Sequence, residues 1–246
     1  MHVDLPTPSS VLAIGAHPDD IEFECGGSLA KWGGSGASIH FLVCTDGSKG
    51  TWDVDADTDA LIARRRTEAA AAASRIHPNA TVHFLEAIDG ELTNTVEQRG
   101  AVARIIRQTT PDIVLGHDPW RRWRMHPDHR AAGFLTVDAV VAARDPHYHR
   151  EHMAEGLQHH RPSSLLLFES EEPDHVEAIE QVHLDAKVRA LLAHESQFET
   201  TMAIDEDDDG HQAQAFAERT LAEARDHGRL AGVGLGEAFR WMNPAS

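Results

Sequence analysis

Short apolar runs alternate with longer stretches of helical patterning along this 246-residue chain, and this alternation limits the fold more than any other feature. The runs that we predict to be strands cover residues 11–15, 38–44, 81–85, 112–115 and 165–168. The stretches that we predict to be helices cover residues 21–32, 59–76, 96–108, 127–144, 184–194 and 213–227. Apolar strands without a polar face, separated by helices, are typical of a parallel sheet covered on both faces. The pattern therefore predicts an α/β fold: a Rossmann-like, doubly wound, mostly parallel sheet with helices on both faces.

The chain has the size and composition of one globular domain. Its hydrophobic fraction of 41% and charged fraction of 25% are ordinary. There is no internal repeat and no long Gly/Ser- or Pro-rich linker. We therefore expect a single domain over residues 1–246, in which residues 199–246 form a C-terminal extension or a lid.

The formal net charge of −18 argues against some classes of partner. A strongly acidic surface repels phosphate backbones and anionic lipids, so we expect neither nucleic-acid binding nor membrane docking. No apolar run approaches the ~20 residues of a membrane-spanning helix, and the N-terminus lacks the pattern of a secretory signal. The two cysteines, Cys25 and Cys44, do not suggest a disulfide framework. A cytoplasmic protein is the default expectation, with a homo-oligomer left open.

Two short clusters of histidine and aspartate carry the chemistry. The first, Ala16-His17-Pro18-Asp19-Asp20, follows the predicted strand 11–15, and the second is His126-Pro127-Asp128-His129, downstream of the run 112–116. Ligands of doubly wound sheets bind beyond the carboxyl ends of the strands, so the two clusters can converge. Histidine supplies a neutral nitrogen and aspartate an anionic oxygen, both of which Zn²⁺ accepts. Three protein ligands would leave a fourth position open, as at a catalytic zinc.

Each cluster also has a structural explanation. Asp19, with Glu22 three positions later, fits an N-terminal capping pattern, and an Asp-Asp pair at a helix start is more often a cap than a catalyst. His126 and His129 alone are equally well explained as surface histidines beside a helix that begins at Pro127. The joint occurrence of both clusters at strand ends favours a metal-dependent hydrolase. In such a site a carboxylate takes a proton from water, and a histidine stabilises the oxyanion or protonates the leaving amine.

The high histidine content leaves an alternative of another class open. The chain contains 18 histidines, several of which lie between residues 147 and 160. A His-rich tract can sequester metal ions, which would make this a noncatalytic metal-binding protein. The irregular spacing of these histidines favours a solvated loop. The two hypotheses differ in stoichiometry, because sequestration predicts several metal ions per chain and the enzyme needs one.

Both clusters resemble the signatures of the LmbE-like (PIG-L) family of zinc-dependent de-N-acetylases. Residues 16–22 are similar to its first signature, although Ile21 separates the Asp pair from Glu22, whereas many members have Glu immediately next. Residues 126–130 are similar to the second signature. The resemblance runs from about residue 11 to 198, and its further matches are Cys25-Gly26-Gly27, residues 45–50, Arg65 with Glu68, residues 89–92, and Lys187 through Gln197.

The resemblance implies a metal site and a reaction. His17, Asp20 and His129 would bind zinc, or another divalent transition metal that accepts the same ligands. The implied reaction removes an N-acetyl (acyl) group from an amide in a small molecule. N-acetylglucosamine-containing compounds, including thiol-cofactor precursors, are the foremost substrates. An amidase acting on thiol S-conjugates or on a secondary metabolite is the second enzymatic hypothesis.

The resemblance also implies roles for the remaining polar residues. Asp19 would be the general base, and His126 the electrophilic or acid partner, oriented by Asp128. Arg65 and Asp89 match positions that face the substrate, often a sugar. Asp89 precedes a glycine, so a simple turn is an alternative for that position.

The segment Trp120-Arg121-Arg122-Trp123-Arg124 immediately precedes the second cluster. Trp can stack on a sugar, and Arg can bind carboxylate or phosphate, so this segment is a candidate contact for an anionic or sugar-like amide. Pairing of its arginines with acidic groups of the chain itself has equal weight. Trp52 is a second candidate wall of the site.

Overall fold

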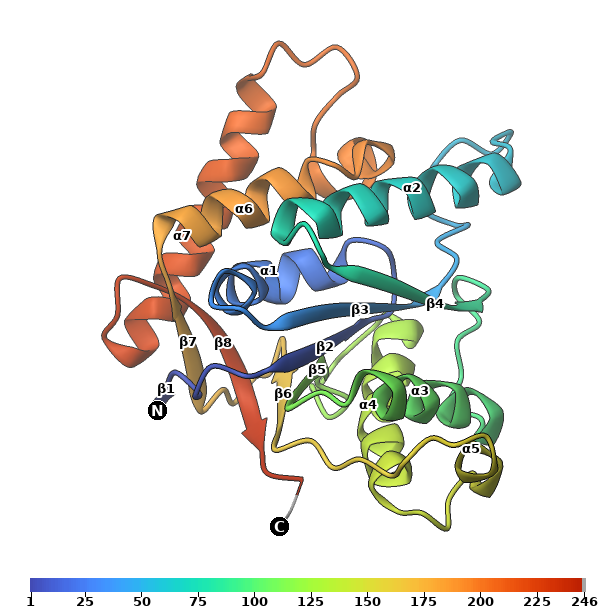
Figure 1. Ribbon diagram of the computed structural model, residues 1–246. Coiled ribbons are helices and arrows are strands. Elements are labelled where there is room, and N and C mark those ends of the chain that lie inside the picture. Colours follow the sequence, from blue (N-terminus) through green and yellow to red (C-terminus); the bar gives the residue numbers. More distant parts are fainter. Residues whose placement is uncertain (245–246) are drawn as a thin grey trace.

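The computed structural model describes residues 1–244 and is built on an eight-stranded sheet of order β1-β7-β8-β6-β5-β2-β3-β4 (Figure 1). The strands are β1 (His2–Val3), β2 (Ser10–Gly15), β3 (Ser38–Thr45), β4 (Thr81–Ala87), β5 (Ile113–His117), β6 (Ser164–Phe168), β7 (His175–Ile179) and β8 (Leu235–Met242). The helices are α1 (Asp20–Gly34), α2 (Thr58–Ile76), α3 (Val96–Thr109), α4 (Pro127–Arg144), α5 (Arg150–Ala154), α6 (Gln181–Leu191) and α7 (His211–Ala231). Single turns of 3₁₀ and π helix follow α6 at Glu195–Gln197 and Phe198–Met202.

The sheet confirms the predicted fold class. Every strand and helix expected from the sequence is present, and β4, β3, β2, β5 and β6 are consecutive parallel neighbours. The chain runs outward from β2 to β4, then returns to the other side of β2 with β5. This reversal between β2 and β5 is the point at which doubly wound sheets bind their ligands.

The C-terminal part of the chain completes the sheet. β8 lies between β6 and β7 and pairs antiparallel with both. Residues 235–242 belong to the tail 199–246, for which we considered an extension or a lid, but here they form an inner strand. Positions 245–246 of that tail lie outside the described residues. β7 was not expected because it carries His175 and Glu177, which are fully buried and contact each other at 2.7 Å.

Alternate residues of the central strand β2 serve the two faces of the sheet. Val11 and Ala13 pack into the core shared with α1, α2 and α6, and Leu12 and Ile14 into the core shared with α3 and α4. Successive side chains of a strand point to opposite faces, so a strand covered on both faces is apolar throughout. Figure 1 shows the two helix layers on either side of the sheet. None of the helices in residues 1–244 has the length and apolarity needed to cross a membrane.

A buried ion pair joins β8 to two helices. The Glu237 carboxylate accepts hydrogen bonds from the backbone N–H groups of Gly27 (2.9 Å) and Ser28 (2.7 Å) and from Lys187 Nζ (2.8 Å). The two N–H groups follow a break in α1 at Cys25, where φ is −142°, so they begin a second helical segment and need an acceptor. Lys187 and Glu237 are only 5% and 1% exposed, so each charge depends on the other.

We expect Lys187→Met to lower the free energy of unfolding by about 3–5 kcal/mol, because it removes the buried cation that pairs with the Glu237 carboxylate at 2.8 Å. The measurement is chemical denaturation followed by circular dichroism. Arg189→Met is the matched control, since Arg189 is an exposed residue of the same helix and its loss changes the net charge equally. A loss below about 1 kcal/mol for Lys187→Met, typical of exposed pairs, would contradict this assignment.

Candidate metal centre and active site

The two sequence clusters meet at the carboxyl ends of β2 and β5. His17 follows β2, Asp20 is the first residue of α1, and His129 lies in the first turn of α4. One ring nitrogen or carboxylate oxygen of each of these residues lies within 4.8 Å of those of the other two. The structure therefore brings together the three residues that the resemblance implied as metal ligands.

The spacing of the donor atoms fits a transition metal. His17 Nδ1 lies 3.4 Å from Asp20 Oδ2, and His129 Nε2 lies 3.3 Å from Asp20 Oδ1. Bonds of about 2.0–2.2 Å at tetrahedral angles place neighbouring ligand atoms about 3.3–3.6 Å apart. Burial alone would lower the pKa of His17, but its hydrogen-bonded carboxylates, first that of Asp128, raise the pKa to about 12. The same carboxylates favour any cation at this position.

Asp128 orients a different histidine from the one we expected. Its carboxylate Oδ2 lies 3.2 Å from His17 Nε2, and the carboxylate also accepts the backbone N–H groups of Gly90 (2.6 Å) and Leu92 (3.2 Å). Only its backbone N–H contacts His126, donating to Nδ1 at 3.3 Å. The expectation that the Asp128 carboxylate orients His126 does not agree with these distances. Asp128 instead holds the Nε2 proton of His17, which leaves Nδ1 of that ring free to bind a metal.

His126 is arranged as a neutral hydrogen-bond donor. It is the N-cap residue of α4, and because its Nδ1 accepts the Asp128 N–H, a neutral ring carries its proton on Nε2. Burial lowers the pKa of His126, and the neighbouring His17 and His129 lower it further. The side chain lines the cavity described below, where an Nε2–H group can donate to a substrate oxygen.

Asp19 does not act as a helix cap, which was the structural explanation for this residue. It occupies the N-cap position of α1, but its side chain makes no capping hydrogen bond, and its φ of 111° is strained for a residue with a side chain. Its carboxylate is buried, lines the cavity and lies 3.7 Å from Arg65 Nη2. Burial raises the pKa of Asp19 to about 6 against the opposing effect of Arg65. A buried carboxylate aimed into a cavity is the arrangement of a general base.

Arg65 and Asp89 both line the same cavity. Arg65 donates from Nη1 to the Gly47 carbonyl at 3.0 Å and from Nη2 to the Pro18 carbonyl at 2.7 Å, so it also holds two segments of the site together. Asp89 Oδ1 lies 3.3 Å from His17 Nε2 and is thus a second neighbour of that ring nitrogen.

The cavity above the cluster has a volume of about 470 Å³. It is lined by the three candidate metal ligands and also by Asp19 and His126. This is within the range of small-molecule sites, about 300–1,000 Å³. Trp52, 69% exposed, is part of the wall, as the sequence suggested. Other wall residues come from the loop after β3, from α1 and from the turns after α6; they include Phe23, Lys49, Gln197, Thr200 and Thr201.

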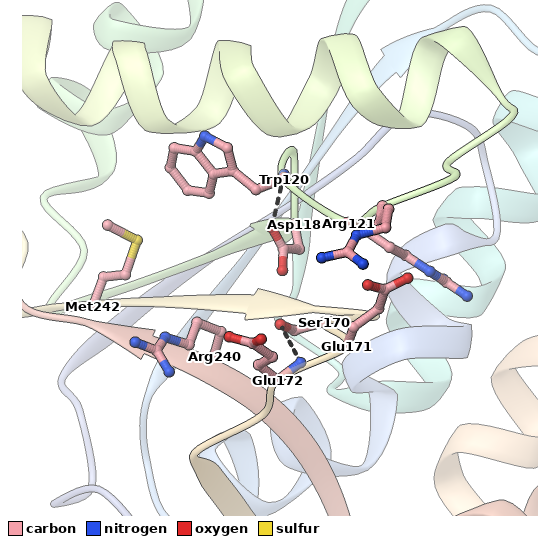
Figure 2. A pocket seen from close by; sticks show the side chains of 9 residues that line it. Asp118, Trp120, Arg121, Ser170, Glu171, Glu172, Arg240 and Met242 are labelled. Atoms are coloured by element: carbon pink, nitrogen blue, oxygen red, sulfur yellow. Dashed lines mark hydrogen bonds between the residues drawn. The ribbon is translucent and has the colours of Figure 1, made fainter.

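The residues that line this cavity include none from the Trp120–Arg124 segment. Trp120, Arg121 and Arg122 line a second cavity of about 370 Å³, together with Glu171 and Arg240 among others (Figure 2). Arg121 and Arg124 donate to the carboxylate of Glu169, at 2.9 and 2.6 Å. Pairing with an acidic group of the chain itself, one of the two alternatives, is therefore the arrangement that these two arginines adopt.

Sequence reasoning missed His117, Glu169 and His194. His117 is the last residue of β5, with Nδ1 2.9 Å from Glu169 and Nε2 3.2 Å from Asp20 Oδ2. Glu169 directly follows the predicted strand 165–168, and His117 lies two positions after the predicted strand 112–115, a signal that could have marked them. His194 is fully buried, and its Nε2 lies 3.4 Å from the carboxylate of Glu22.

The His-rich stretch contains one further group of potential metal ligands, formed by His149, Glu151 and His152. Arg107 Nη1 lies 2.9 Å from His152 Nδ1, so a guanidinium charge already occupies one side of this group. That charge disfavours a second cation there.

The sequence and fold match a known family. The family model of PIG-L, described as GlcNAc-PI de-N-acetylase, matches residues 12–140, which include both clusters. A diacetylchitobiose deacetylase of Thermococcus kodakarensis is 38% identical over 188 residues, covering 76% of this chain and 70% of that protein. A 1D-myo-inositol 2-acetamido-2-deoxy-alpha-D-glucopyranoside deacetylase of Rhodococcus erythropolis is 31% identical over 163 residues, covering 56% of this chain and 55% of that protein.

A solved structure extends the match to nearly the whole chain. The N,N'-diacetylchitobiose deacetylase of Pyrococcus horikoshii superimposes with a TM-score of 0.84 at 30% identity, covering 97% of this chain and 85% of that one. Fold and site together define a Rossmann-like α/β protein with a His/Asp group at the strand reversal. Within that class, the chain belongs to the PIG-L (LmbE-like) family of de-N-acetylases.

Proposed function

We propose that this protein is a zinc-dependent deacetylase that hydrolyses the acetamide of N-acetylated sugars to acetate and a free amine. The observation that carries the proposal is the placement of His17, Asp20 and His129 within 4.8 Å of one another beneath a cavity that also contains Asp19 and His126. The relatives from T. kodakarensis and R. erythropolis, which are named as deacetylases of acetamido sugars, support this substrate class.

Zinc bound by these three residues would act as a Lewis acid and lower the pKa of water to about 7. Asp19 takes a proton from the attacking water, since its carboxylate is free of capping bonds and faces the cavity. His126 donates its Nε2–H to the amide oxygen as negative charge develops there. Protonated Asp19 then returns its proton to the leaving amine. Asp128 holds His17 in the required tautomer throughout.

A direct test uses the purified protein, stripped of metal and reloaded with zinc. Amine and acetate release are measured with diacetylchitobiose, N-acetylglucosamine and an N-acetylated thiol conjugate. We expect release from an N-acetyl sugar that stops on chelation and returns with one equivalent of zinc per chain. Release from the thiol conjugate alone would support the amidase hypothesis instead, and several tightly bound zinc ions without hydrolysis would support metal sequestration. Parallel loading with manganese, iron or cobalt compares zinc with the other metals that this ligand set accepts.

Trp52→Ala is expected to raise KM for an N-acetyl sugar about fivefold with little change in kcat. Its ring forms part of the cavity wall, and loss of an aromatic contact of this kind costs about 1 kcal/mol. Arg122→Ala is the control, because Arg122 comes from the Trp120–Arg124 segment and lines the other cavity. Steady-state kinetics of both variants decide the point. A rise in KM for Arg122→Ala with no rise for Trp52→Ala would indicate that the substrate binds in the other cavity, which contradicts this prediction.

Three statements stay predictions from the sequence: a cytoplasmic location, the absence of nucleic-acid and membrane partners, and a homo-oligomer.

A further inference from the structure

Glu169 lies beside His129, on the side of the ring that faces away from Asp20. It follows β6 with a left-handed backbone (φ 59°), and its side chain is 17% exposed. Its carboxylate lies 2.9 Å from His117 Nδ1, 2.9 Å from Arg121 Nη1 and 2.6 Å from Arg124 Nη1. Two cations therefore keep this carboxylate ionised where it is largely removed from solvent.

A histidine that binds a metal through one ring nitrogen carries its proton on the other, and that proton needs an acceptor. For His17 the acceptor is Asp128, as described above. For His129, Nε2 faces Asp20, so a metal bound on that side requires the ring proton to be on Nδ1. In this structure Nδ1 accepts a hydrogen bond from Arg124 Nη1 at 2.9 Å, and Glu169 Oε2 lies 3.7 Å away. A guanidinium has no acceptor, which leaves Glu169.

We propose that Glu169 is a positioning residue for the metal centre, which accepts the Nδ1 proton of His129 and so keeps the Nε2 lone pair directed toward Asp20. The inference rests on the metal site of the proposed function. Glu169 also accepts from His117, whose Nε2 lies 3.2 Å from Asp20 Oδ2, so one carboxylate contacts the rings on both sides of that ligand. The metal-binding arrangement requires the His129 Nδ1–H to replace Arg124 Nη1 as its neighbour and to approach Glu169.

This role also explains the Trp120–Arg124 segment. Arg121 and Arg124 are not among the residues that line the substrate cavity, and they neutralise a carboxylate that serves a ligand histidine. The competing explanation is that Glu169 only anchors this segment by ion pairs. The two explanations predict different zinc affinities for a variant that lacks the Glu169 carboxylate but has its local net charge restored. The affinity stays low if Glu169 positions His129, and it recovers if Glu169 only balances the arginines.

The test measures zinc affinity by competition with a chelator, with no sugar present. Glu169→Gln is expected to weaken zinc binding about 10–100-fold, the usual cost of removing the acceptor behind a ligand histidine. Glu171→Gln is the matched control, because Glu171 is exposed, lies two positions away and changes the net charge equally, and its affinity should stay within about twofold of wild type. The double variant Glu169→Gln with Arg121→Gln restores the local charge, and we expect its affinity to stay as low as that of Glu169→Gln.

Wild-type affinity in Glu169→Gln, or recovery in the double variant, would overturn the positioning role. If Glu169→Gln does not fold, as judged by circular dichroism, Glu169→Asp withdraws the carboxylate from His129 and must show the same loss. Because affinity is measured without substrate, the two proposals fail separately. If Glu169→Gln binds zinc more weakly and the wild-type protein deacetylates no sugar, the positioning role is upheld and the proposed function is overturned. If the wild-type protein deacetylates a sugar and Glu169→Gln binds zinc as tightly as wild type, the proposed function is upheld and the positioning role is overturned.

Discussion

We expect Asp19→Asn to lower kcat for deacetylation of an N-acetyl sugar by about 10²–10⁴-fold, the usual contribution of a general base, while the protein still binds one zinc ion. Asn has nearly the same shape as Asp but cannot take a proton from water. The wild-type carboxylate lines the cavity, makes no capping bond and contacts Arg65 at 3.7 Å, so its loss removes chemistry rather than a helix cap. The measurements are initial rates of amine release and the zinc content of the same preparation.

Asp59→Asn is the control for this prediction, because Asp59 is exposed in the first turn of α2 and the charge change is the same. Its rate should equal that of wild type. A zinc-loaded Asp19→Asn protein that hydrolyses its best substrate as fast as wild type would assign the base elsewhere. The fully buried His194, whose Nε2 lies 3.4 Å from the Glu22 carboxylate, would then be the next residue to vary.

The second large effect concerns the metal itself. His129→Ala should weaken zinc binding roughly 10²–10³-fold, about 3–4 kcal/mol, which is one ligand's share of the 10–16 kcal/mol typical of a four-ligand zinc site. Deacetylation at limiting zinc should fall in parallel. Isothermal titration with a competing chelator measures the affinity.

His159→Ala separates this site from the His-rich stretch. His159 is exposed and belongs to that stretch, so its loss should leave the affinity for the first zinc ion unchanged. Equal losses in both variants would mean that zinc binds to the histidines collectively, as the sequestration hypothesis requires.

The parallel half of the fold was predictable because its strands are buried on both faces. Val11 to Ile14 serve two cores in alternation, so the run is apolar throughout and stands out from its neighbours. β7 gave no such signal, because its buried positions include His175 and Glu177. The Glu177 carboxylate accepts from the Leu5 N–H and from Lys31 Nζ, both far away in the chain. β8 lies in the tail 199–246, for which the sequence pattern predicted no strand. Local patterning does not reveal a strand whose polar residues are satisfied by distant partners.

The site was predictable where its residues are adjacent in the chain. Each cluster places its residues on one strand-to-helix turn, and the reversal between β2 and β5 brings the two turns together. We expected the Asp128 carboxylate to orient His126, but it contacts His17, which is 111 positions away in the chain. Glu169 was missed for the same reason, since its contact with His117 spans 52 positions. The chemistry of a ligand histidine can be read from a motif, but the acceptor behind it depends on the tertiary structure.

The most direct test of the account is zinc-edge anomalous diffraction from crystals of the zinc-loaded protein. The proposed zinc site predicts one strong peak per chain, about 2.0–2.2 Å from His17 Nδ1, an Asp20 oxygen and His129 Nε2. A peak at the His149, Glu151 and His152 group, or one between His117 and Glu169 without contact to His17, would contradict it.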